Sequence, residues 1–168
     1  MTALIADNIS CLEQGRELLR TLPAELYHQK CPQCFNSTMG GHMRHNTDHY
    51  ECFLKGYATG RVDYDDRTRD TMIETDPAYA EGVLARLADG LEQMDASLLD
   101  APLQVKMDGG ESQEWSPSSV RRELQFLLSH TIHHYALMVA IGQCSGFNTF
   151  PDRFGVAPST LKHRAVRA

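Results

Sequence analysis

The sequence has no excess of positive charge and no long hydrophobic run, and both absences restrict its partners. It carries 16 Lys and Arg residues against 22 Asp and Glu residues, a formal net charge of −6 at pH 7. Nucleic-acid backbones and anionic membranes both require a basic protein surface, so we expect neither as a partner. No run of 18 apolar residues occurs, so a membrane-spanning helix is not expected.

A secretory signal and a disulfide framework are also missing. Residues 1–14 lack the basic region and apolar block of a signal peptide, so we expect a cytoplasmic protein. The five cysteines are odd in number and are expected to be reduced. Cys31 and Cys34 form a CxxC motif, which is typical of redox centres or of half a structural zinc site. No second such pair follows at zinc-finger spacing, so two cysteines in an irregular loop is the favoured interpretation.

The apolar residues of the sequence are distributed as in a single helical domain. Apolar residues make up 42% of 168 residues, enough for a core, and we expect a single domain over 1–168. Hydrophobic periodicity and breakers predict four long helices, near residues 2–21, 40–57, 77–94 and 116–143. The fold class predicted is therefore all-α, an antiparallel four-helix bundle.

The segments between these helices are expected to be irregular for the most part. Residues 60–66 look like a charged connector. Residues 100–115, which include Asp108-Gly109-Gly110, predict a short hairpin or a long loop before the last bundle helix. Residues 146–168 are punctuated by Gly, Pro and Ser and are expected to form a tail packed on the bundle.

Histidine is the residue type that points to chemistry. Six of the eight histidines lie in two clusters on predicted helices, namely His42, His45 and His49, and His130, His133 and His134. Side chains four apart on a helix lie one above the other, about 6 Å apart at Cβ. His130 and His134 can therefore bind one ion, at a Zn–N distance of about 2.0–2.1 Å. Leu127, Leu137 and Ile141 lie on the same helix line, which indicates that this pair faces the interior.

A third ligand has to come from the first cluster. Three ligands plus water is the open arrangement of catalytic metal centres. Periodicity does not decide among the three histidines, and it slightly favours His42 and His49, which lie nearer the apolar side of their helix than His45. Imidazole ligands alone do not fix the ion, because Zn, Ni, Cu and Fe all accept them.

Several motifs together resemble the DinB/YfiT-like superfamily of metal-dependent enzymes. The similar stretches are Ser37–Tyr50, Arg122-Glu123-Leu124, Ser129–Leu137 and Phe154–Leu161. In that superfamily the fold is a four-helix bundle that is usually dimeric. One His from the second helix joins a His-x-x-x-His pair from the last bundle helix to bind a divalent metal, often zinc or nickel.

Carried over position by position, the resemblance implies three metal ligands: His45, His130 and His134. His45 lies seven residues after Thr38 and three before Asp48, as in the His-x-x-Asp pattern of the family. His42 then stands where the family usually has an aliphatic residue, so His42 and His49 remain alternatives to His45.

The resemblance also implies a chemistry. Known activities of the superfamily include transfer and isomerisation reactions that use a low-molecular-weight thiol. A metal-bound thiolate or water is then the implied reactive species, because a cation deprotonates a coordinated thiol near neutral pH. Asp48, one helical turn from His45, is the candidate catalytic residue, either orienting the imidazole or accepting a proton, with an exposed helix carboxylate as the alternative. Tyr50 and Tyr135 are expected in the core.

We therefore predict a divalent-metal-dependent transferase or hydrolase of small molecules that acts as a homodimer. Two alternatives remain open on the same sequence. One is a non-catalytic metal-binding or stress-response protein on the same fold. The other is a structural helical bundle whose histidines only satisfy polar contacts.

Overall fold

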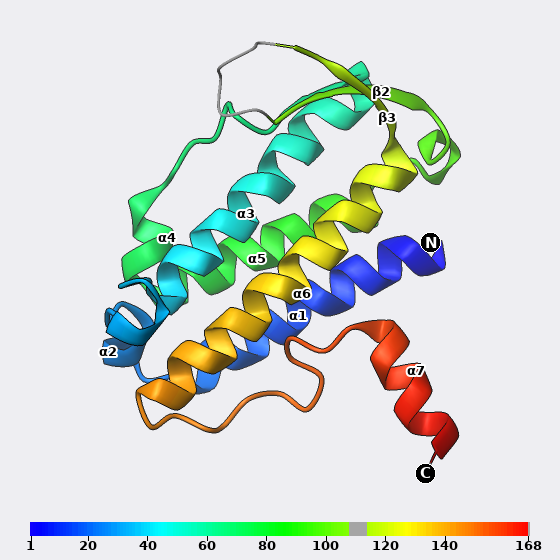
Figure 1. Ribbon diagram of the computed structural model, residues 1–168. Coiled ribbons are helices and arrows are strands. Elements are labelled where there is room, and N and C mark those ends of the chain that lie inside the picture. The colour runs from blue at the N-terminus through cyan, green and yellow to red at the C-terminus, as the bar shows by residue number, and fades with distance from the viewer. Residues whose placement is uncertain (108–113, 168) are drawn as a thin grey trace.

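The computed structural model describes residues 1–107 and 114–167, and the side chains of all of these except 162 and 164–167. The predicted turn at Asp108-Gly109-Gly110 lies outside the described residues. Helices dominate the chain (Figure 1). The α-helices are α1 (Ala3–Thr21), α2 (Ala24–Tyr27), α3 (Met39–Gly56), α4 (Thr71–Thr75), α5 (Pro77–Glu92), α6 (Val120–Cys144) and α7 (Pro158–Arg167). Short 3-10 turns are η1 (Pro32–Cys34), η2 (Tyr57–Thr59) and η3 (Ala96–Leu98).

The starts of the long helices follow local capping chemistry. Asp76 precedes Pro77, and its carboxylate accepts hydrogen bonds from the backbone N–H groups of Ala78 and Tyr79 at 2.9 and 3.1 Å. This confirms the predicted start of α5. The last long helix was expected from residue 116, yet α6 begins at Val120, because residues 116–119 pair as a strand instead.

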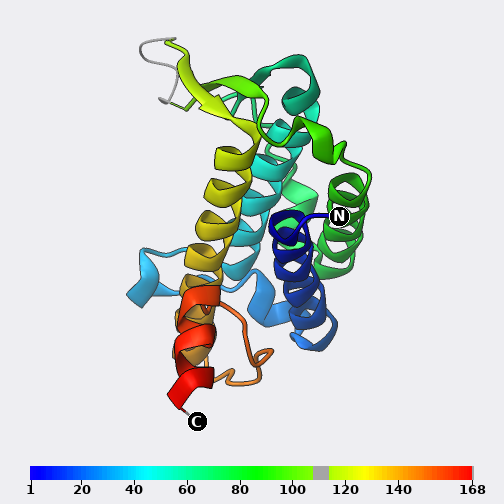
Figure 2. The same ribbon diagram turned by 90° about the vertical axis from the view of Figure 1, so that its right-hand side faces the viewer.

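The four long helices pack in pairs around a common core. α1 lies against α5 and α6, and α3 lies against the same two helices (Figure 2). Their apolar faces meet in a contiguous buried cluster, which includes Leu12, Phe53, Leu84, Leu127 and Met138. Burial of such side chains is the main favourable contribution to folding. This packing brings the histidine-bearing helices α3 and α6 side by side.

A buried polar network crosses the core beneath the histidines. Tyr50 of α3 donates its hydroxyl to Asn8 Oδ1 of α1 at 2.8 Å. The Asn8 amide in turn donates to the carbonyl oxygen of Leu124 in α6 at 3.2 Å. Because buried polar groups need partners, this chain of bonds fixes the relative rotation of three helices. Tyr50 and Tyr135 are both fully buried, as expected from the sequence.

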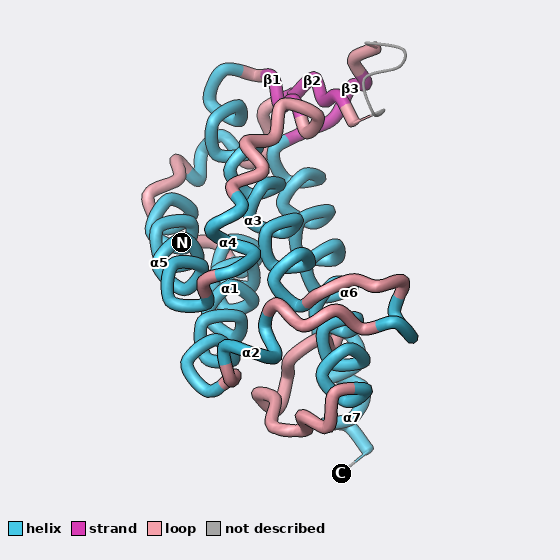
Figure 3. The backbone as a smooth tube through the Cα atoms, turned by 90° about the vertical axis from the view of Figure 1, so that its left-hand side faces the viewer, coloured by secondary structure: helices cyan, strands magenta, loops and turns pink. Residues whose placement is uncertain are grey.

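A small sheet corrects the all-α prediction. Its strands are β1 (Arg61–Asp63), β2 (Pro102–Lys106) and β3 (Ser116–Ser119). β2 and β3 pair antiparallel, but β3 lies beyond residues 100–115, where a hairpin or a loop was expected, and in the segment predicted to start the last helix. β1 pairs parallel with β2 and comes from the segment expected to be a connector. The sheet lies at one end of the long helices, opposite α2 (Figure 3).

The segment after α6 folds back along that helix. The rings of Phe154 and Tyr135 stack at 4.1 Å between centroids. Gly155 has φ of 71° and would place a Cβ 2.7 Å from the backbone nitrogen of Ala136, so only glycine allows this close approach. The predicted tail also contains α7, which its sequence pattern did not reveal. Over the described residues, the structure contains no helix with the length and apolar character needed to cross a bilayer.

Candidate metal centre

Two neighbouring helices supply the histidines of the candidate site. His42, His45 and His49 lie on α3, and His130, His133 and His134 lie on α6. Thr38 caps α3 by accepting a hydrogen bond from Gly41 N at 2.9 Å, and Ser119 caps α6 by accepting one from Arg122 N at 3.3 Å. The local sequence thus fixes where each helix begins, and helix packing brings the two sets of rings together.

His45 is the centre of the cluster. The centroid of its ring lies 4.5 Å from that of His49, 4.9 Å from that of His130 and 4.6 Å from that of His134. The Nε2 atoms of His45 and His130 are 2.9 Å apart. A tetrahedral zinc ion with Zn–N bonds of about 2.0–2.1 Å separates two nitrogen ligands by about 3.3 Å. An increase of a few tenths of an ångström in the distance between the two Nε2 atoms would therefore admit an ion.

The three predicted ligands share two residues with the group of histidines whose donor nitrogens lie closest together. The rings of His45, His130 and His134 meet, with centroids 4.5–4.9 Å apart. The donor nitrogens that all lie within 4.8 Å of one another belong to His45, His49 and His130. The structure brings the three predicted residues together and adds His49. The assignment of His45, His130 and His134 as the metal ligands stays a prediction.

His49 and His42 have distinct surroundings within the cluster. His49 Nδ1 lies 2.7 Å from the backbone carbonyl oxygen of His45. A carbonyl only accepts, so Nδ1 carries the proton and Nε2 keeps a free lone pair, the usual state of a metal-ligating imidazole. His42 Nδ1 instead lies 2.8 Å from Nδ1 of His134. His133 is exposed and takes no part in this contact.

The imidazoles are held in their neutral form. Burial, followed by the charges of His49 and His130, lowers the pKa of His45 to about 3. Burial likewise lowers the pKa of His130 to about 4 and that of His134 to about 3, with neighbouring histidines adding to the effect. Metal binding requires the neutral ring, so these ligands need not lose a proton near pH 7.

Arg67 is a neighbour of the site that the sequence did not reveal. Its guanidinium donates to His45 Nδ1 at 3.3 Å. His45 therefore accepts at Nδ1 and carries its proton on Nε2, which faces His130. Binding of an ion at Nε2 of His45 requires that proton to move to Nδ1, and Arg67 then has to withdraw. No motif marked Arg67, because it lies in a charged segment without periodicity.

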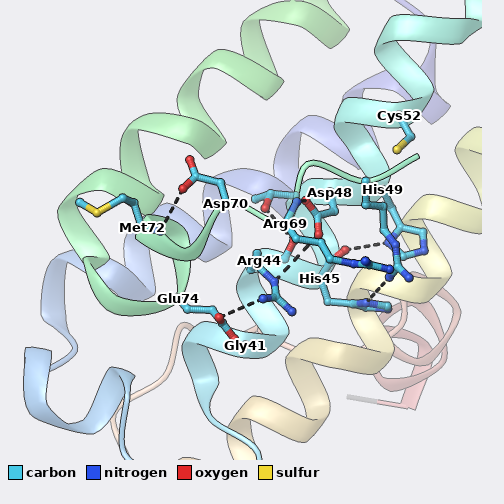
Figure 4. Close-up of polar contacts among 12 residues, drawn as sticks. Gly41, Arg44, His45, Asp48, His49, Cys52, Arg69, Asp70, Met72 and Glu74 are labelled. Carbon is cyan, nitrogen blue, oxygen red and sulfur yellow. Dashed lines mark hydrogen bonds and ion pairs between the residues drawn. The ribbon is translucent and has the colours of Figure 1, made fainter. Parts of the chain in front are cut away.

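Asp48 faces the segment that carries Arg67. Its Oδ1 accepts from the backbone N–H of Arg69 at 3.1 Å, and its Oδ2 lies 4.0 Å from Arg44 Nε (Figure 4). Arg44 also pairs with Glu74 of α4 at 2.9 Å. The carboxylate is buried, which excludes the exposed alternative. These contacts give Asp48 a role in fixing the 65–70 segment on α3, and its catalytic role stays a prediction.

A polar cleft leads to the histidines. It has a volume of about 440 Å³, and its lining includes Lys30, His42, Arg44, His45, Glu74 and His134. Two cationic side chains against one carboxylate make this cleft favourable for small anionic molecules. The arrangement is thus a cluster of neutral imidazoles between two helices, next to an open space large enough for a small ligand.

The chain thus has a mostly helical fold in which histidines from two helices form a group that could hold a metal ion. The chain matches the sequence model of the DinB superfamily over residues 11–138 and belongs to this superfamily. That match includes every histidine of the cluster.

A curated relative shares part of the chain. FK506-binding protein 5 of Rhizopus delemar is 35% identical to it over 105 residues, which make up 61% of this chain and 27% of that protein. The chain therefore spans about a quarter of the length of this relative. No solved structure matches the chain.

Proposed function

We propose that this protein is a divalent-metal-dependent enzyme in which His45, His130 and His134 bind zinc or nickel and leave a coordination position open. The observation that carries the proposal is the convergence of imidazoles on His45, whose Nε2 lies 2.9 Å from that of His130. DinB superfamily membership supports the same conclusion.

The donor set fits a transition-metal ion rather than calcium or magnesium. Imidazole nitrogen suits zinc and nickel, whereas the hard cations prefer oxygen ligands. His49 lies beside the predicted three and is the natural replacement for His134 if the geometry of the ion requires it. Either triad leaves a position for an exogenous ligand.

We propose a thiol-dependent transfer or hydrolysis reaction as the activity. The bound ion would supply Lewis acidity that lowers the pKa of a coordinated thiol or water. Lys30 and Arg44 line the cleft and would bind an anionic group of the substrate, such as the carboxylate of a small thiol. Arg67 would move from His45 towards the negative charge that develops in the open position.

Three further expectations belong to this proposal. The pairwise packing of α1, α3, α5 and α6 supports the antiparallel four-helix bundle of the superfamily, within one domain over 1–168. The family resemblance supports a homodimer, which sedimentation of the purified chain would test. The charge balance supports a small molecule rather than nucleic acid or a membrane as partner, and we expect a cytoplasmic location.

Metal analysis tests the site. Protein purified without a histidine tag should hold about one zinc or nickel ion per chain at the histidines, and His45→Ala, His130→Ala and His134→Ala should each weaken binding by about tenfold or more. His28→Ala, at an exposed position outside the histidine cluster, is the matched control and should bind as the wild type. Equal metal content in His45→Ala and the control would contradict the proposal.

Turnover tests the activity. The metal-loaded protein, incubated with low-molecular-weight thiols and a panel of electrophiles, should consume thiol, and removal of the ion should abolish the reaction. Arg44→Ala should raise KM for anionic thiols more than it lowers kcat, because it removes binding rather than chemistry. A metal-loaded protein that is inert with the whole panel would support the non-catalytic alternative.

A further inference from the structure

A second cluster of metal-binding side chains lies away from the histidines. Cys31 precedes the turn η1, Cys34 is the last residue of that turn, and Cys144 is the last residue of α6. Their three sulfur atoms all lie within 4.8 Å of one another. All three are free thiols. The CxxC motif therefore does not stand alone in a loop, because a cysteine more than 100 residues away completes a group of three.

The separation of the sulfur atoms suits a thiolate-bound ion. Zinc–sulfur bonds of about 2.3 Å place two tetrahedral sulfur ligands about 3.8 Å apart. The sulfur atoms lie within 4.8 Å of one another, so only a small decrease in their separations is needed. Rotation of the side chains can supply it. Thiolate ligands are soft and favour zinc and similar thiophilic ions over calcium or magnesium.

The loop is pre-formed around the first two cysteines. The carbonyl oxygen of Cys31 accepts hydrogen bonds from the backbone N–H groups of Cys34 and Asn36, both at 3.0 Å. Cys31 N also donates to the carbonyl oxygen of Ser37 at 2.9 Å, which closes the loop. A loop closed in this way holds the two thiols on one side without any need for metal-induced folding.

The two residues that directly follow the CxxC motif have an unfavourable backbone conformation. Phe35 and Asn36 both have φ of 57°, in the left-handed region, which is unfavourable for a residue with a side chain and more so for Phe35 than for Asn36. Phe35 is 99% exposed, so its ring gains no packing energy that would offset this cost. The turn places the thiols of Cys31 and Cys34 close to that of Cys144.

We propose that Cys31, Cys34 and Cys144 form a second metal site, which binds zinc through three thiolates and takes its fourth ligand from solvent or an added thiol. Among the described residues, no fourth His, Cys, Asp or Glu donor joins the group. The site joins the loop that leads into α3 to the end of α6. A zinc ion there ties together the two helices that carry the histidines.

Cobalt(II) distinguishes this site from the histidine site, because only thiolate ligands give a sulfur-to-cobalt charge-transfer absorption in the near ultraviolet. The reduced, metal-free full-length chain should develop this band as cobalt(II) is added, and zinc should remove it by displacement. The band should persist in the double variant His130→Ala/His134→Ala. A failure of the histidine site therefore leaves this result unchanged.

Serine variants identify the ligands. Cys144→Ser lies at an exposed helix end and should remove most of the band without affecting folding. Cys34→Ser should do the same. Cys52→Ser is the matched control, because Cys52 lies outside the group and its thiol contacts the carbonyl oxygen of Asp66 at 3.5 Å. A band that is absent from the reduced wild-type protein, or that survives in Cys144→Ser, overturns the proposal.

Thiol reactivity gives an independent readout. Cys144 is exposed, so a thiol reagent should modify it rapidly in the metal-free protein. Bound zinc should slow this modification by about tenfold or more, because coordination occupies the sulfur lone pair. If zinc gives no protection and mild oxidation instead joins Cys31 to Cys34, the motif is a redox pair and the zinc site is wrong.

Discussion

His45 and His130 meet nitrogen to nitrogen across the α3–α6 contact, with their Nε2 atoms 2.9 Å apart. A contact this short is a hydrogen bond in which one ring donates and the other accepts, so the pair cannot hold two protons on the facing atoms. Protonation of either ring would place a positive charge next to other imidazoles and Arg67. The same arrangement that repels protons presents lone pairs to a metal ion.

The lowered pKa values of the histidines predict acid sensitivity of the metal-free protein. In the unfolded chain these rings take up protons below about pH 6.5. In the folded protein, burial and neighbouring histidines lower the pKa of His45 and His134 to about 3 and that of His130 to about 4. The unfolded state therefore binds more protons between these values, and stability is lost as pH falls from about 6.5 towards 4.

Urea denaturation of the metal-free protein at pH 7 and pH 5 measures this effect. The midpoint should be lower at pH 5 in the wild type. His45→Gln/His134→Gln, which removes two of the titrating rings, should reduce the difference, whereas His28→Gln, at an exposed position, should leave it unchanged. A midpoint that does not depend on pH over this range would show that the rings are not held neutral by the fold.

Asp48 allows its structural and catalytic roles to be separated. Asp48→Ala removes the acceptor for Arg69 N–H at a buried position and should cost about 1–3 kcal/mol in free energy of unfolding. Asp48→Asn keeps a carbonyl acceptor at the same place and should cost less. If Asp48 is catalytic as predicted, Asp48→Asn should nevertheless lose activity with metal content unchanged; full activity in Asp48→Asn would leave only the structural role.

The helices and their histidines could be predicted from the sequence, but the choice of ligands could not. Positions 42, 45 and 49 are spaced three and four apart, so they share one face of α3 and all reach the α6 histidines. Periodicity assigns a side chain to a face, and it does not resolve which of three rings on that face meets a given partner. That depends on helix rotation, which contacts such as Tyr50–Asn8 determine.

The features that the sequence did not predict depend on distant contacts. β1 is three residues long and pairs with β2, some 40 positions later in the chain, so no local alternation marks it. The short helix α4 does carry a local signal, because the Asp70 carboxylate accepts from Met72 N at 2.9 Å as a helix cap. Cys144 joins Cys31 and Cys34 only through tertiary packing, which sequence spacing cannot show.

Two buried tyrosines adjacent to the histidines should respond oppositely to loss of the hydroxyl. Tyr50→Phe leaves Asn8 Oδ1 without its donor in the core, so it should cost about 1–3 kcal/mol in free energy of unfolding. Tyr135 is the matched control, because its buried hydroxyl has no hydrogen-bond partner among the described residues. Tyr135→Phe removes an unsatisfied polar atom and should be neutral or stabilising.

Denaturant titration of both variants at pH 7 gives the difference directly. An equal loss in the two would mean that Tyr135 bonds to an ordered water and that the hydroxyl of Tyr50 has no special role in holding α1, α3 and α6 together.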